Sequence, residues 1–176
     1  MNARSVKQAL MVAFASLMLS ATLPISVGAA DLKAVEQWRS ISLAAAQQAA
    51  QTALSSCQKK GAMVAVVVVD RAGVPLVMLR DSLAGMHTPE AASRKAWTAV
   101  SFKNGTSELA KATAYDQASS GIRGLSNVAM IGGAIVIREA GSIIGAIGVS
   151  GAPNGEMDDA CAKAGVDAIQ EAIELN

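Results

Sequence analysis

The sequence predicts an α+β fold with a mainly antiparallel sheet, and two observations carry this expectation. Two pairs of short stretches rich in β-branched residues are each joined by a tight turn, which is the pattern of β-hairpins. Stretches of helical length and composition flank each pair. The expected order is helix, two strands, two helices, two strands, helix, so the strands come in hairpins rather than in βαβ units.

The first helix is expected over residues 42–60, where alanine, leucine and glutamine dominate. Ser42 is suited to cap its first turn, and Gly61 to follow its last. Residues 62–70 are dense in valine and predict a strand buried on both faces. After a short turn, residues 74–80 complete the first hairpin.

A second helix is expected to start at Thr88, because Thr88 can cap, Pro89 suits the first position and Glu90 favours the first turn. It is expected to reach Asn104 and to stop at Gly105.

A further helix over residues 106–118 and a loop should lead into the second hairpin, with strands over 128–139 and 142–151. The glycine pair 132–133 interrupts the first of these strands and suggests a bulge or a close approach. The final helix is expected over residues 156–175, with acids in its first turn.

Residues 1–30 have the three-part pattern of a secretory signal peptide. Arg4 and Lys7 precede an apolar run over residues 9–23, and small residues precede a cut before Asp31 or one residue earlier. The run is shorter than the roughly 20 residues of a membrane span, and no later run is long and uninterrupted enough. We therefore expect a periplasmic or secreted protein whose single domain covers residues 31–176.

The mature composition excludes some partners and favours others. Without Arg4 and Lys7 the formal net charge changes from +1 to −1, which gives no electrostatic case for nucleic acid. Aromatic residues make up only 3% of the chain, so the core must consist of small aliphatic side chains. Such a core buries little area per residue, and a homo-oligomer would bury more.

Cys57 and Cys161 are the only cysteines, and export would place them in an oxidising compartment. Cys57 lies near the end of the first predicted helix and Cys161 near the start of the last. If these helices pack antiparallel, the two ends meet and a disulfide joins them. The alternative is a pair of buried free thiols.

His87 is the only histidine of the chain and directly precedes the helix expected at Thr88. One imidazole is too few for a zinc site, but haem iron needs only one or two protein ligands. The positive end of the helix dipole favours neutral imidazole, the form that binds metal. The ordinary alternative is an exposed histidine without a ligand.

Other residues near His87 extend this hypothesis to a cofactor site. Met86 offers a thioether as an alternative iron ligand, and Arg94 or Lys95 can pair with a haem propionate. The two cations are equally well explained as the solvated face of a helix. No Ser–His or phosphate-loop arrangement is evident, so no catalytic residue is assigned.

Several motifs together resemble the GlcG/HbpS family of haem-binding or haem-degrading proteins. They are "VVVVDRAGVPLVMLRD" at 66–81, "HTPEAASRKAWTAVSF" at 87–102, "GGAIVIREAGSIIGAIGVSGA" at 132–152 and "DDACAKAGVDAI" at 158–169. The resemblance implies a profilin-like fold, with a five-stranded antiparallel sheet and helices on both faces. Only four strands follow from the sequence pattern; a fifth is expected near residues 122–130 or before Ser42.

The resemblance also implies homo-oligomers and, in some members, haem binding or degradation. We therefore predict an exported protein that binds haem non-covalently, with the iron on His87 and a site formed by Met86, Thr88, Arg94 and Lys95. The alternative is an enzyme or accessory protein for small hydroxy acids or diols, which would bind an anion at the Thr88 helix start.

Overall fold

The elements follow each other in the predicted order. A computed structural model describes residues 34–175, and their helices and strands lie in one unit, Gln37–Asn176. The elements are α2 (Leu43–Lys59), β1 (Ala65–Asp70), β2 (Pro75–Arg80), α3 (Thr88–Phe102), α4 (Thr106–Ala112), the 3₁₀ helix η1 (Ser120–Gly124), β3 (Ala134–Glu139), β4 (Ser142–Ser150), α5 (Gly155–Asp167) and α6 (Gln170–Glu174).

The sheet is antiparallel throughout and has the strand order β2-β1-β4-β3. Both predicted hairpins are present, which confirms the α+β class. The number of strands is corrected from five to four among residues 34–175. The stretch at 122–130 forms the end of η1 and a loop in which Asn127 has a left-handed φ of 71°.

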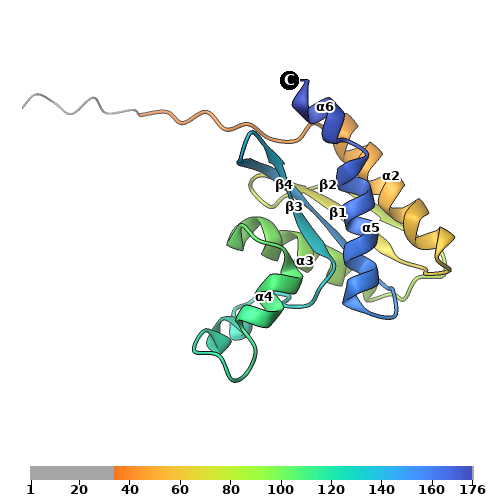
Figure 1. Cartoon of the computed structure of the whole chain (residues 1–176), viewed down its shortest axis with the longest axis vertical. Coiled ribbons are helices and arrows are strands. Elements are labelled where there is room, and N and C mark those ends of the chain that lie inside the picture. Colours follow the sequence, from red (N-terminus) through yellow and green to blue (C-terminus); the bar gives the residue numbers. More distant parts are fainter. Residues whose placement is uncertain (1–33, 176) are drawn as a thin grey trace, which may run out of the picture. The chain divides into compact units, whose positions relative to one another are not determined.

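Helices cover both faces of the sheet, as expected (Figure 1). Side chains from Val64 to Val69 alternate between the two faces. Val64, Val66 and Val68 face the layer formed by α2 and α5, whereas the alternate residues Val67 and Val69 face α3. All five valines are fully buried. The core therefore consists of two thin aliphatic layers with the sheet between them.

Three helices differ from the prediction at their ends. The helix after residue 105 stops at Ala112 rather than 118, and the final helix is broken into α5 and α6 at residues 168–169. At α3 the N-cap position is occupied by His87, which has helical dihedral angles, and its side chain makes no capping hydrogen bond. Thr88 is the first helical residue, so its predicted role as the cap is wrong. At α2 Ser42 caps as predicted and accepts a hydrogen bond from the N–H of Ala45.

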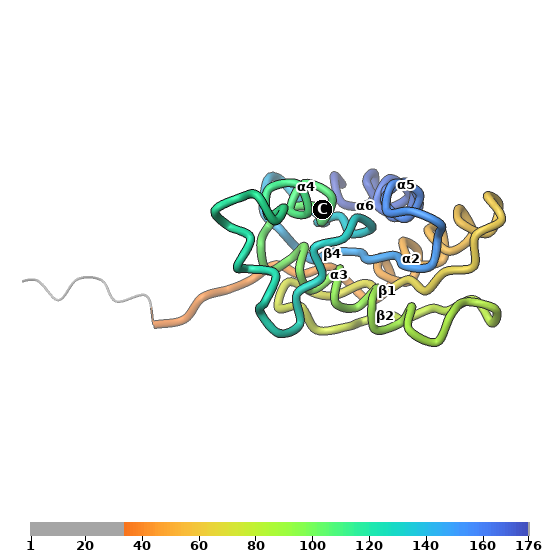
Figure 2. Tube along the Cα trace, turned by 90° about the horizontal axis from the view of Figure 1, so that it is seen from below, coloured from red at the N-terminus to blue at the C-terminus, as the bar shows by residue number. Residues whose placement is uncertain are grey.

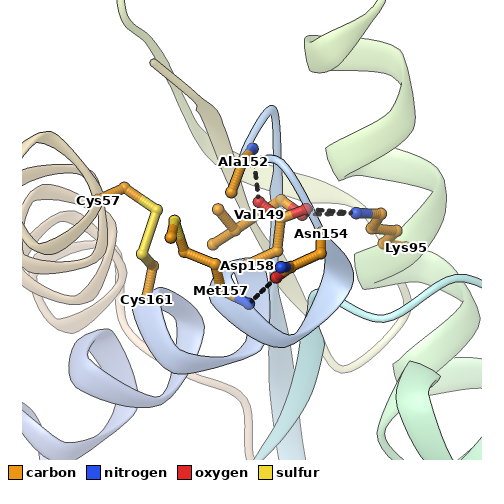
Figure 3. Close-up of a disulfide and its surroundings, with 8 residues drawn as sticks. All are labelled: Cys57, Lys95, Val149, Ala152, Asn154, Met157, Asp158 and Cys161. Carbon is orange, nitrogen blue, oxygen red and sulfur yellow. Dashed lines mark hydrogen bonds and ion pairs between the residues drawn. A yellow bond between two sulfur atoms is a disulfide. The ribbon is translucent and has the colours of Figure 1, made fainter. Parts of the chain in front are cut away.

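A disulfide joins Cys57 of α2 to Cys161 of α5, with 5.5 Å between the two Cα atoms (Figure 3). The predicted pairing is thus confirmed. In residues 34–175 no helix is both long and apolar enough to cross a membrane. The predicted signal peptide, residues 1–30, lies outside the described residues.

Candidate functional site

A cleft of about 430 Å³ lies between α3 and the segment that follows α4. Figure 2 shows this segment as a loop that leaves α4 and returns along α3 before β3 begins. The cleft is lined by His87, Glu90, Arg94, Tyr115, Arg123 and Met130, among others. It therefore brings together two of the predicted site residues, His87 and Arg94, with residues from a distant part of the chain.

The first wall of the cleft is one face of α3. His87, Glu90, Ala91 and Arg94 recur at the three- and four-residue spacing that places side chains on one side of a helix. His87 is exposed, and its imidazole lies over Gly85: a Cβ added there would be 2.8 Å from the ring carbon Cε1. The absence of a side chain at position 85 thus leaves room for the ring in this position.

The second wall is held by Arg123. Its guanidinium donates hydrogen bonds to the carbonyls of Thr113 and, at 2.7 Å, of Ala110, and it lies 5.4 Å from the centroid of the Tyr115 ring. Thr98 of α3 accepts a hydrogen bond of 2.9 Å from the N–H of Ala129 and so holds the returning loop against the helix. Arg123 therefore has a fixed position and no carboxylate partner within the described residues.

The electrostatics of the cleft are mainly positive. Arg94 and Arg123 contribute two cations, and Glu90 is the one carboxylate among the described lining residues. Glu90 accepts from Arg94 at 2.7 Å in an i,i+4 pair whose side chains are 68% and 47% exposed. Such an exposed pair holds the arginine only weakly, so Arg94 is available to an anionic ligand.

Three of the predicted site residues do not line this cleft, namely Met86, Thr88 and Lys95. Met86 is 93% exposed and is absent from the lining. Thr88 is buried, and its hydroxyl donates a hydrogen bond of 2.8 Å to the carbonyl of Gly85. The Thr88 N–H donates to the same carbonyl, so both of its polar hydrogens are used within the chain.

Lys95 is the clearest correction to the predicted site. Its ammonium is buried and donates to Asp158 of α5 at 2.9 Å and to the carbonyl of Val149 at 3.0 Å (Figure 3). Both side chains of the ion pair are only 4% exposed. A propionate on the surface cannot reach this group, so Lys95 ties α3 to α5 instead of binding a ligand.

Burial raises the pKa of Asp158 above its ordinary value, although the hydrogen bond and the charge of Lys95 act in the opposite direction. The N–H of Ala152 donates to the second carboxylate oxygen at 3.1 Å. Asp158 was predicted only as an acid in the first turn of the last helix. It does occupy that turn, but its main partner is a lysine on the other side of the sheet.

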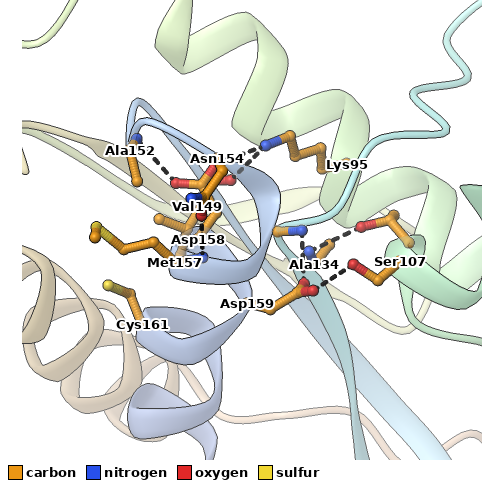
Figure 4. A network of polar contacts seen from close by, with 12 residues as sticks. Lys95, Ser107, Ala134, Val149, Ala152, Asn154, Met157, Asp158, Asp159 and Cys161 are labelled. Atoms are coloured by element: carbon orange, nitrogen blue, oxygen red, sulfur yellow. Dashed lines mark hydrogen bonds and ion pairs between the residues drawn. The ribbon is translucent and has the colours of Figure 1, made fainter.

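Asp159 forms a second polar cluster beside this pair (Figure 4). Its carboxylate accepts from the hydroxyl of Ser107 and, at 2.6 Å, from the N–H of Gly133. Gly133 has a φ of +125°, and a Cβ there would lie 2.8 Å from Lys95 Nζ. The predicted close approach at this glycine pair is confirmed: Gly133 lies against the carbonyl of Val149 and the buried Lys95–Asp158 pair.

Little in the sequence indicates that Tyr115, Arg123 and Met130 line the same cleft as His87. They lie more than 25 positions from His87, in a predicted helix, a predicted loop and a predicted strand respectively. The only signal is an arginine between two glycines, in "GIRG". Within residues 34–175 no three side chains of His, Cys, Asp and Glu type form a group that would hold a metal ion.

The chain belongs to the HbpS-like family. The family described as haem degrading protein HbpS-like matches residues 41–167, so the resemblance seen in the sequence is confirmed. An uncharacterized 15.0 kDa protein of the dhaT–dhaS intergenic region of Citrobacter freundii is 31% identical over 139 residues, which cover 77% of this chain and 96% of that protein.

Solved structures agree with this assignment. A double mutant of HbpS from Streptomyces reticuli is 36% identical and has a TM-score of 0.74, with coverage of 78% of this chain and 92% of that one. The PduOC:heme complex is 30% identical and has a TM-score of 0.70, with coverage of 74% and 95%.

Proposed function

We propose that this protein binds haem in the cleft between α3 and the loop after α4, with His87 as the iron ligand. The observation that carries the proposal is the position of His87 at the mouth of a cleft that also holds two guanidinium groups. Imidazole is a common axial ligand of haem iron, and arginine pairs well with carboxylates such as propionates. The HbpS-like family and the haem complex of PduOC support the same ligand.

The dimensions of the cleft suit a porphyrin. His87 and Arg94 are seven residues apart on one helix face, which is about 10 Å along the axis. This is the scale of a porphyrin with its propionate arms. Tyr115 and Met130 add an aromatic and an apolar surface for the ring. When bound, the haem would supply the iron chemistry, while His87 binds and orients it and Arg94 and Arg123 hold its propionates.

The test is a hemin titration followed by the Soret band. We expect the wild-type protein to shift and sharpen the band, and His87→Ala to lose most of this signal. Met86→Ala is the matched control, because Met86 is the neighbouring residue and does not line the cleft. It should titrate like the wild type.

Gly85→Ala sharpens the test, since it keeps the imidazole but forces the ring to move. It should weaken hemin binding less than His87→Ala but more than Met86→Ala. Equal titration curves for the wild type and His87→Ala would refute the iron assignment.

We further propose that the protein is exported to the periplasm or secreted, and that it is a homo-oligomer. The disulfide supports export, because such bonds persist in oxidising compartments. Large exposed side chains in the lining of the cleft support an oligomer: Tyr115 is 90% and Ile131 60% exposed. A second subunit on this surface would cover them and offer the other axial ligand.

A small hydroxy acid or diol is the second candidate ligand, favoured by the two arginines of the cleft. It would bind through Arg94 and Arg123 rather than at the helix start. Thr88 and Ala91 already donate their N–H groups within the chain, and Pro89 has none. Thermal stabilisation by glycolate that Arg94→Gln abolishes and His87→Ala preserves would favour this candidate over haem.

A further inference from the structure

A second cleft, of about 340 Å³, lies at the end of the sheet where both hairpin turns meet. The end of β1 pairs with the start of β4, as Asp70 opposite Gly145 shows, so the two turns lie at the same end. Arg71 follows β1, Arg138 lies near the end of β3, and Lys103 follows α3. Three cations thus come together from three separate elements.

No carboxylate lines this cleft among the described residues. Within residues 34–175 Lys103 makes no ion pair or side-chain hydrogen bond, and the two arginines donate only to backbone carbonyls. Asp70 and Glu139 are the nearest acids along the chain, but neither lines the cleft. Asp70 accepts from the N–H groups of Ala72 and Val74, and Glu139 pairs with Arg39. Three positive charges in one concave site whose described lining holds no carboxylate attract an anion.

The two guanidiniums are fixed before any ligand arrives. Arg71 donates to the carbonyl of Ile143 at 2.6 Å. Arg138 donates to the carbonyl of Lys103 at 2.9 Å and to that of Gly141 at 3.2 Å. Each guanidinium has five N–H donors, so donors remain for a ligand. Groups that are already ordered lose little entropy on binding, which raises affinity.

Trp38 adds a flat surface at the rim of the cleft. Its indole is 65% exposed, and the Arg71 guanidinium lies 5.1 Å from the ring centroid. The chain after Trp38 is held against the turn that follows β1, because the Ser40 hydroxyl accepts a hydrogen bond from the Arg71 N–H at 3.2 Å. The N–H of Ile41 also donates to the carbonyl of Ile144 at 2.9 Å. The indole is thus held beside the cations.

We infer that this cleft binds a small polyanion, through carboxylate or phosphate groups held by Arg71, Lys103 and Arg138. Its lining shares no residue with the cleft at His87, so it is a separate site. A purely structural role for the arginines, as braces of the two turns, explains their backbone hydrogen bonds. It does not explain an unpaired lysine, an exposed indole and the absence of acids in the same concavity.

Trp38 provides the readout. Because the chain has two tryptophans, Trp97→Phe leaves Trp38 as the only one. In this background, inorganic pyrophosphate and citrate are titrated separately at constant ionic strength, with Trp38 emission and calorimetry as independent measurements. We expect saturable binding, and the stronger of the two probes identifies phosphate or carboxylate as the preferred group.

Lys103→Gln and Arg138→Gln should each weaken binding by about tenfold, the loss expected for one charge-assisted hydrogen bond. Arg94→Gln is the matched control, since it removes a cation of the other cleft, and it should leave this binding unchanged. Conversely, Lys103→Gln should bind hemin like the wild type. Failure of the haem proposal would therefore leave this result untouched.

Three outcomes would overturn the inference. The first is no saturation by either probe up to about 10 mM, where affinity is negligible. The second is equal weakening by Lys103→Gln and Arg94→Gln, which would mean a diffuse charge effect. The third is loss of hemin binding in Lys103→Gln with full binding in Arg94→Gln, which would make this cleft the haem site and not a separate one.

Discussion

Arg94 and Lys95 are neighbours in the chain, but they lie in opposite environments. The Arg94 side chain is 47% exposed, faces the cleft and pairs with Glu90 on its own helix. The Lys95 side chain is 4% exposed and pairs with Asp158 on a helix that packs on the other side of the sheet. Arg94 is thus available to a ligand in the cleft, whereas Lys95, the next residue, is buried in the core.

The difference follows from helix geometry. Successive side chains point about 100° apart, because a turn takes 3.6 residues. Arg94 shares a face with His87, whereas Lys95 lies nearer the face of Ala92, Ala96 and Ala99, which pack on the sheet. A positive charge therefore has a different energetic role at each of these two positions. On the surface it contributes little to stability, and in the core its loss leaves another charge unpaired.

Removing the buried cation should have the largest effect. Lys95→Met leaves the Asp158 carboxylate without its partner in the core, and we expect a loss of about 3–5 kcal/mol in the free energy of unfolding. Urea unfolding measures it. Arg94→Met is the matched control on the adjacent residue and should cost less than about 1 kcal/mol. Similar losses for the two variants would show that the burial of Lys95 carries no energetic weight.

The pH dependence of this loss identifies its cause. Burial already raises the pKa of Asp158 above 3.8, and Lys95→Met removes the two influences of Lys95 that lower it. A carboxyl whose folded pKa is raised stabilises the fold below its unfolded pKa and loses this contribution as pH rises through the folded value. The stability of Lys95→Met should therefore fall more steeply with rising pH than that of the wild type.

We expect the gap between the two proteins to be widest near neutral pH and to narrow as the pH falls through the raised pKa of Asp158, where the carboxyl takes up a proton. Urea unfolding across this range measures it. The double variant Lys95→Met/Asp158→Asn should lose the added slope, because asparagine cannot ionise. A gap that stays constant with pH would show that lost packing, rather than an unpaired charge, destabilises Lys95→Met.

Local patterns were enough to predict most of the fold. The valine-rich strand, the two tight turns and the Ser42 cap are short-range signals, and each is confirmed. Cys57 and Cys161 were paired because the predicted helix order placed their ends together. The fifth strand was implied by the family resemblance and not by the sequence pattern, which gave the four strands observed. The break before α6 shows where composition alone misleads, since good helix formers do not by themselves fix where a helix ends.

The site was predictable only where it lies on one element. His87 and Arg94 share a helix face, so their spacing placed them together. Arg123 and Tyr115 reach the cleft through a loop whose path depends on tertiary contacts such as the one between Thr98 and Ala129. Lys95 was misassigned because its partner, Asp158, is 63 residues away. No local pattern distinguishes a buried lysine from a solvated one on a helix of small residues.

Changes to the exposed Arg94–Glu90 pair should have the smallest effect on stability. They also test directly whether the charge of the cleft controls hemin binding. Arg94→Gln and Glu90→Gln should each change the free energy of unfolding by less than about 0.5 kcal/mol.

Their effects on hemin affinity should have opposite signs. Arg94→Gln removes a propionate partner and weakens binding, whereas Glu90→Gln frees Arg94 and removes the one carboxylate among the described lining residues, so binding strengthens. Both effects should shrink with added salt, because exposed charges are screened. Hemin titrations at low and high salt measure them, and shifts of the same sign would show that the charge of this cleft does not control hemin binding.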